Sequence, residues 1–99
     1  MPRTTAGITI GNQVIRSGTS IGANVEESQN ASSRKDFLRG VTIALKEARE
    51  TEYWLKLIQS TELLGNINDL TVLLQEINEL IKILTTIIKN TKANSGIQS

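Results

Sequence analysis

Apolar residues recur along most of this chain at the three- and four-residue spacing that is typical of an amphipathic α-helix. The pattern breaks twice, at the short polar run 30–33 and around Gly65, and both breaks have the residue types of turns between helices. We therefore predict a single all-α domain, residues 1–99, with helices over about residues 8–29, 34–63 and 69–92.

The third predicted helix has the most regular apolar pattern. Three adjacent heptad lines are apolar at every position, and Val72 and Ile83 add apolar surface outside them. The lines are Leu70, Ile77 and Leu84; Leu73, Leu80 and Ile87; and Leu74, Ile81 and Ile88. One neighbouring helix cannot cover so wide a stripe, and uncovered apolar area usually marks an interface. Isoleucine-rich seams also favour assemblies larger than dimers. The pattern therefore predicts self-association.

The first predicted helix carries small residues where a packing face is expected. Gly11 and Gly18 follow one line of this face, and each glycine costs about 1 kcal/mol relative to alanine inside a helix. The close approach of another helix backbone would explain them, so we expect this helix to be the tightly packed centre of the bundle. The start of the second helix is predicted by Ser33 and Asp36, which together resemble a capping box.

Asn24 is an amide on the otherwise apolar side of the first helix, and a buried amide needs hydrogen-bonding partners. Glu27 lies about one helical turn further on and reaches the same neighbour. We predict that these two residues face Glu50 or Thr51 of the second helix. The predicted structural polar layer consists of Arg16, Ser20, Asn24, Glu27 and Glu50. The alternative is that these residues face solvent or line a site for a ligand.

The amino-acid composition excludes most of the residue types that enzymes use for catalysis. Among 99 residues there is no cysteine and no histidine, so the commonest thiol nucleophile, general base and metal ligand are missing. A di-iron bundle needs a Glu-x-x-His motif on two helices, which a chain without histidine cannot supply. A P-loop needs a lysine, which the segment from Gly18 to Gly22 lacks. We predict a protein that is not an enzyme and that has no catalytic, metal or cofactor site. With no basic-apolar leader and no long apolar run, we expect a cytoplasmic chain without a membrane partner.

The net charge of the chain neither excludes nor favours a nucleic-acid interface. Eleven basic residues face ten acidic ones, for a net charge of +1, so no strong field attracts a polyanion. Bases and acids interleave along the second helix, which is typical of a solvated face. The candidate nucleic-acid contacts are Arg34, Lys35, Arg39, Lys46 and Arg49. Tyr53 and Trp54 are the only aromatic pair that could stack on a base, and packing at a helix contact is the alternative.

Two segments, 11–27 and 44–55, resemble the bacterial four-helix bundle proteins encoded in intervening sequences of 23S ribosomal RNA genes. That family also includes the accessory proteins of diversity-generating retroelements. Its pattern of an arginine, a serine-isoleucine pair, an asparagine and a glutamate falls on Arg16, Ser20, Ile21, Asn24 and Glu27. The resemblance implies an antiparallel up-and-down bundle and a ring-shaped homopentamer. It also implies that some relatives bind nucleic acid and assist a reverse transcriptase.

The chain departs from this family at its start and in its charge. Relatives usually have a further helix before the segment that resembles 3–7, so we expect three helices here, with the first helix of the bundle missing. Relatives that bind nucleic acid are strongly basic, whereas this chain carries +1. The predicted function is therefore a non-enzymatic, self-assembling bundle, with an RNA-binding partner of a reverse transcriptase as the alternative.

Overall fold

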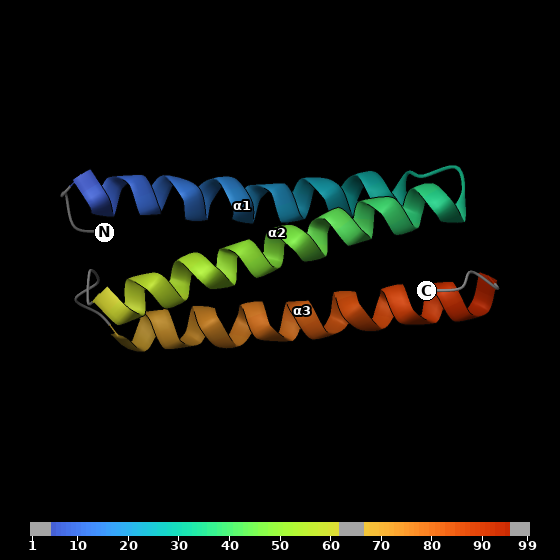
Figure 1. Ribbon diagram of the computed structural model, residues 1–99. Helices are drawn as coiled ribbons and strands as arrows, with labels where there is room; N and C mark the ends of the chain where they lie inside the picture. Colours follow the sequence, from blue (N-terminus) through green and yellow to red (C-terminus); the bar gives the residue numbers. More distant parts are fainter. Residues whose placement is uncertain (1–4, 62–66, 96–99) are drawn as a thin grey trace.

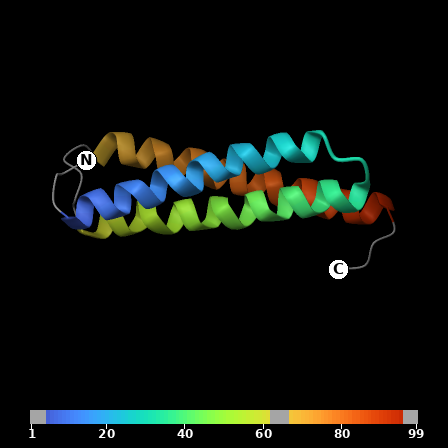
Figure 2. The same ribbon diagram turned by 90° about the horizontal axis from the view of Figure 1, so that it is seen from above.

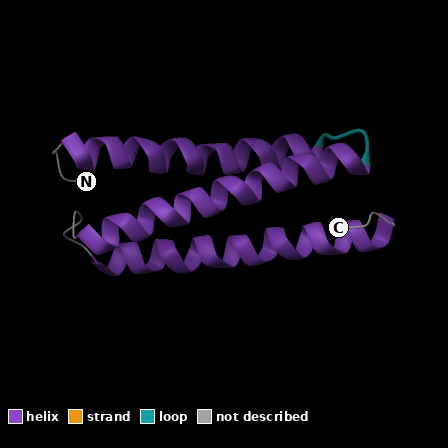
Figure 3. Ribbon diagram, in the orientation of Figure 1, coloured by secondary structure: helices purple, strands orange, loops and turns teal. Residues whose placement is uncertain are grey.

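The computed structural model describes residues 5–61 and 67–95, which form three long helices (Figure 1). The helices are α1 (Thr5–Gln29), α2 (Arg34–Thr61) and α3 (Ile67–Ser95). The part of the chain that the structure describes contains no strand, and Figure 3 shows one described connection, between α1 and α2. The predicted all-α helical bundle is confirmed, and each predicted helix boundary lies within three residues of the observed one. The predicted break around Gly65 lies outside the described residues.

The turn between α1 and α2 ends in the predicted helix cap. Ser33 Oγ accepts a hydrogen bond of 3.1 Å from the backbone N–H of Asp36, and the Ser33 carbonyl accepts one of 3.0 Å from that of Phe37. At the other side of the turn, the backbone N–H groups of Asn30 and Ala31 donate to the last carbonyls of α1. These bonds satisfy backbone groups that a helix end leaves free, and they reverse the chain within four residues.

The central helix is α2, which corrects the expectation that the first helix occupies the centre. α2 packs against both neighbours, whereas no Cα atom of α1 lies within 8 Å of one in α3. Figures 1 and 2 show α1 and α3 running in the same direction, with α2 antiparallel to both. The body measures 48 × 19 × 18 Å. The prediction was based on the small residues of α1. Such residues indicate close contact with one other helix, but they do not indicate how many helices surround α1.

The core is a single apolar cluster with α2 at its middle. Its buried members are Ile10 and Ile21 from α1; Val41, Ala44, Ala48, Leu55 and Ile58 from α2; and Leu70, Ile77 and Leu84 from α3. α3 thus buries only the middle one of its three apolar heptad lines. The two flanking lines are partly covered or exposed, and Leu73 is 46% exposed. One neighbour covers about one line of a helix, so α3 keeps apolar surface outside the core.

Close helix approach occurs at Gly40 of α2 and not at Gly18 of α1. A Cβ atom on Gly40 would lie against Ser28 Oγ, 3.2 Å from Ser28 Cβ and 3.3 Å from the Asn24 carbonyl oxygen. A Cβ atom on Gly18 or Gly22 would have no atom within 4 Å. The close approach expected at Gly18 is therefore absent from the described part of the chain. Gly40 has that role in the α1–α2 contact.

Over the described residues, none of the helices has an apolar stretch long enough to span a membrane.

Candidate functional site

The buried polar contact between α1 and α2 is made by two hydroxyl groups. Thr51 Oγ1 lies 2.7 Å from Ser17 Oγ and 2.9 Å from the Glu47 carbonyl oxygen, and Ser17 Oγ donates to the Gln13 carbonyl at 2.9 Å. Both residues are buried. Each hydroxyl therefore has partners, as buried polar groups require, and the pair fixes the register of α1 against α2.

Next to this pair, Arg16 of α1 joins two glutamates of α2. Its guanidinium forms an ion pair with Glu50 and a second one, of 3.4 Å, with Glu47. The indole N–H of Trp54 donates to Glu50 at 3.4 Å. Arg16 is half exposed, so solvent screens these charges and the pairs add little to stability. Their effect is mainly geometric, because one arginine spans the α1–α2 seam.

Asn24 and Ser20 form a hydrogen bond within α1 and not between helices. Asn24 Nδ2 donates to the Ser20 carbonyl at 2.9 Å and lies 3.2 Å from Ser20 Oγ. Asn24 is only half buried and Glu27 is exposed, and neither faces Glu50 or Thr51 of the same chain. The reason is local: an asparagine inside a helix can satisfy its amide on the carbonyl four residues earlier. Of the predicted layer, Arg16 and Glu50 meet between the two helices, and Ser20 and Asn24 meet within α1.

Asn24 and Glu27 instead line an open cavity of about 550 Å³ beside the α1–α2 turn. Asp36 and Arg39 lie on its α2 side and form an ion pair with each other at 2.9 Å. Every buried polar side-chain atom in the described residues has a hydrogen-bond partner. The cavity wall therefore offers no buried polar group that waits for a ligand.

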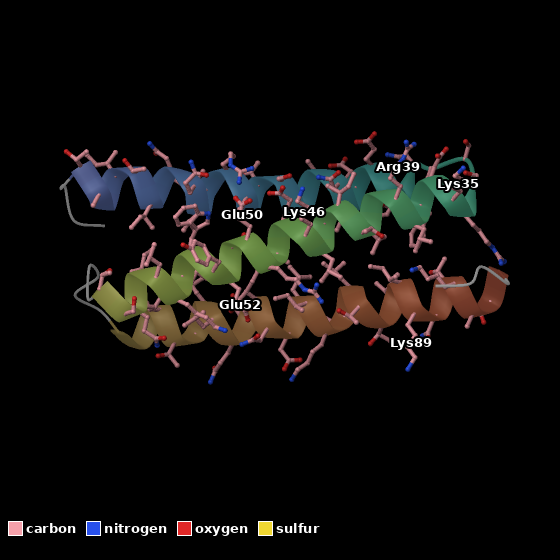
Figure 4. The ribbon with its side chains drawn as sticks, in the orientation of Figure 1. Lys35, Arg39, Lys46, Glu50, Glu52 and Lys89 are labelled. Carbon is pink, nitrogen blue, oxygen red and sulfur yellow. The ribbon has the colours of Figure 1, made fainter. Side chains whose placement is uncertain are left out.

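The residues predicted to contact nucleic acid all lie on α2, and they differ in whether they contact other residues of the protein. Arg34 donates to the Asn94 carbonyl at 3.2 Å and Arg39 pairs with Asp36. Lys35, Lys46 and Arg49 form no ion pair with any residue that the structure describes. Figure 4 shows Lys35, Arg39 and Lys46 along one length of α2, while Lys89 points outward from α3.

The acids of α2 are neutralised by residues other than these three. Glu47 and Glu50 pair with Arg16, and Glu52 pairs with Lys56 at 3.7 Å and lies between α2 and α3 in Figure 4. Asp36 pairs with Arg39. The interleaved acids therefore cancel the charge of Arg16, Arg39 and Lys56, and α2 keeps an excess of positive charge on its outer surface.

Three side-chain contacts, one between α1 and α2 and two within α2, were not predicted. Ser17 of α1 and Thr51 of α2 meet across the seam, but serine and threonine are common on packing faces, and their residue types do not indicate that they are partners. Glu50 and Trp54 are four residues apart, a spacing that permits side-chain contact on a helix, and this could have been noticed. Tyr53 stacks edge-on against Trp54 with ring centroids 5.0 Å apart, so the aromatic pair packs on itself.

In the described ranges, no group of three or more carboxylates could hold a metal ion. Three long helices, a single apolar core and a hydroxyl pair between two of them define an all-α helical bundle protein. Residues 3–86 match the family model of the 23S rRNA-intervening sequence protein. The chain belongs to this family.

A solved relative supports the same assignment. It is the crystal structure of a protein with unknown function from the S23 ribosomal protein family of Bacteroides thetaiotaomicron. The two sequences are 46% identical, the match covers 81% of this chain and 73% of that chain, and the TM-score is 0.76. A comparison with curated proteins found no match.

Proposed function

We propose that this chain is a self-assembling helical bundle protein that is not an enzyme and whose first partner is another copy of itself. The observation that supports self-assembly is the apolar surface that the protomer leaves uncovered. The exposed residues with the largest apolar side chains on α1 and α3 are Ile8, Ile15, Val72, Leu73 and Ile83, with exposed fractions between 46% and 68%. On a body only 18–19 Å wide, this is a large apolar area, and such areas usually mark protein contacts.

The non-enzymatic part of the proposal rests on the residue types that the chain contains. Without histidine or cysteine, general-base and nucleophilic catalysis would depend on carboxylates, lysines and hydroxyls. The carboxylates at the α1–α2 seam are already engaged by Arg16 and Trp54. The matches to known proteins name no enzymatic activity.

Self-assembly predicts a particle mass well above that of one chain. The family resemblance implies a homopentamer, so we expect a mass near five times 10.9 kDa in dilute neutral buffer at micromolar concentration. Size-exclusion chromatography with multi-angle light scattering measures this mass directly. A folded particle of 10.9 kDa at that concentration would contradict the proposal, and a stable mass at another multiple would correct only the number of copies.

The excess positive charge of α2 supports a second candidate function, weak binding of single-stranded RNA. Lys35, Lys46 and Arg49 are exposed, and the acids of the same helix are engaged by other residues. Tyr53 is also exposed and could stack on one base. With a net charge of only +1, such binding should be nonspecific and sensitive to salt. Among retroelement relatives, a reverse transcriptase would be the protein partner that fits this function.

Replacing Lys46 and Arg49 by glutamine tests the RNA candidate. If both contact phosphates, each substitution should make the negative slope of log K against log salt concentration shallower by about 0.7. Filter binding to an unstructured RNA at several salt concentrations measures the slope. The matched control is Lys82→Gln on α3, because Lys82 already lies 3.8 Å from Glu79. An unchanged slope in the α2 variants would exclude Lys46 and Arg49 as phosphate contacts.

A further inference from the structure

Tyr53 lies on the outward side of α2, away from both neighbouring helices, and its side chain is 58% exposed. Residues two positions apart on a helix point about 200° apart. Thr51 and Leu55, two positions before and after Tyr53, are buried and line a groove between α1 and α3. Phe37 and Trp54, the other two aromatic residues, are partly buried against the core. Tyr53 is therefore the one aromatic ring of the chain that is open to solvent.

Trp54 contacts the Tyr53 ring and restricts its motion. The two ring centroids are 5.0 Å apart and the ring planes form an angle of 71°, which is an edge-to-face contact. In such a contact one of the two rings presents only its edge, so Trp54 covers at most one face of Tyr53. The indole is itself packed against the apolar core. Tyr53 thus has a fixed neighbour and keeps a free face on which another ring can stack.

A series of polar contacts connects Trp54 to α1. The indole N–H donates to Glu50 at 3.4 Å, and Glu50 forms an ion pair with Arg16. Arg16 Nε also donates to Gln13 Oε1 at 3.2 Å, so side chains of both helices hold the guanidinium. Figure 4 shows Glu50 between α1 and α2. Removal of Arg16 would release the Glu50 carboxylate and, with it, the hydrogen bond that orients the indole.

Cationic side chains flank Tyr53 along the same side of α2. Arg49 lies about one turn before it, Lys46 about two turns before it, and Lys56 three residues after it. Within the described residues, Lys46 and Arg49 form no ion pair, whereas Lys56 pairs with Glu52 at 3.7 Å. Binding sites for single-stranded nucleic acid combine cations that contact the phosphates with aromatic rings on which the bases stack. This side of α2 carries both kinds of group.

We propose that Tyr53 stacks on one base of a single-stranded RNA and that Arg16 is the positioning residue for this contact. Arg16 acts through Glu50 and Trp54, which fix the tilt of the tyrosine ring. Arg16 also neutralises a carboxylate that would otherwise repel the phosphates. This inference rests on the candidate RNA-binding function. It adds the residue that contacts the base and the residue that orients it.

Two ligands of equal length and charge separate stacking from phosphate contacts. One is an oligouridylate, and the other is the same ribose-phosphate chain without bases. The ratio of their dissociation constants measures the base contacts, because phosphate contacts contribute equally to both. For the wild type, we expect the oligouridylate to bind about fivefold more tightly or better. Tyr53→Phe should retain this ratio, and Tyr53→Leu should bring it close to one.

Arg16→Gln tests the positioning role. The variant should remain folded, since these half-exposed ion pairs add little to stability, and its ratio should fall by about threefold. The matched control is Arg39→Gln, because Arg39 pairs with Asp36 on its own helix. It should leave the ratio unchanged even if both ligands bind more weakly. The chain has a single tryptophan, so the emission maximum of Trp54 should shift in Arg16→Gln and not in Arg39→Gln.

Each outcome bears on a different part of the inference. A wild-type ratio near one would overturn the stacking contact and leave charge-driven RNA binding in place. A ratio that persists in Tyr53→Leu would place the base contact elsewhere and overturn the inference as well. If Tyr53→Leu abolishes the ratio and Arg16→Gln does not change it, Tyr53 contacts the base and the role of Arg16 is wrong. A wild type that binds neither ligand overturns the candidate RNA-binding function together with this inference.

Discussion

Replacing Ile58 by alanine is expected to lower the free energy of unfolding by about 2–5 kcal/mol. Ile58 is 1% exposed and is one of the largest fully buried side chains in the described core. Truncation removes its transfer free energy and leaves a cavity, because long helices packed in a narrow bundle cannot collapse fully into the space. For a domain of this size, such a loss is a large fraction of the total stability.

Urea denaturation followed by circular dichroism measures this change. Wild type and variant must be compared at one protein concentration, since association with other copies would add to the apparent stability. The matched control is Ile83→Ala, the same chemical change at a residue that is 53% exposed. It should change the stability by no more than about 0.5 kcal/mol in the absence of association. Equal losses in both variants would show that Ile58 is not part of a close-packed core.

Gly40→Ala is expected to destabilise the protein by about 1–3 kcal/mol, although alanine is the better helix former. The new methyl group would overlap Ser28 Oγ, which donates to the Asn24 carbonyl at 2.8 Å. Ser28 is buried, so its side chain cannot simply turn into solvent. Either the hydrogen bond breaks or α1 and α2 move apart, and both changes cost more than the propensity gain.

Gly18→Ala is the opposite case and provides the control. Its methyl group meets nothing within 4 Å, so the substitution should raise the stability by up to about 1 kcal/mol through helix propensity alone. Both variants are compared by their midpoints of urea denaturation. The double variant Ser28→Ala, Gly40→Ala should recover part of the loss, because the closest atom is gone. If Gly40→Ala proved as stable as Gly18→Ala, the close approach of α1 and α2 at this point would be wrong.

Periodicity and turn chemistry were sufficient to predict the secondary structure. The 30–33 turn and the Ser33 cap are encoded by neighbouring residues, so no tertiary information was needed to place the start of α2 at Arg34. The continuous apolar lines of α3 likewise required a helix and predicted that one neighbour would not cover it. The family resemblance in 11–27 and 44–55 was confirmed by the match over residues 3–86.

The candidate site was predicted only in part, because side-chain partners are not a local property. Arg16 and Glu50 do meet across the seam, as the polar layer required. The amide of Asn24 was expected to need another helix, yet the carbonyl of Ser20 satisfies it four residues away in its own helix. The buried contact instead joins Ser17 and Thr51, whose short hydroxyl side chains fit where two backbones lie close together.

By itself, the sequence determined that this protein is helical, where its helices begin and end, and how much of each helix is apolar, because these properties depend on residues within a few turns of one another. Only the tertiary structure decided that α2 is the central helix, that Gly40 and not Gly18 is the point of close approach, and that α3 buries a single heptad line. The same arrangement left the groove between α1 and α3. The physical reason is that an apolar face in the sequence predicts only that the face is buried. Which helix buries it depends on how all the helices pack against one another.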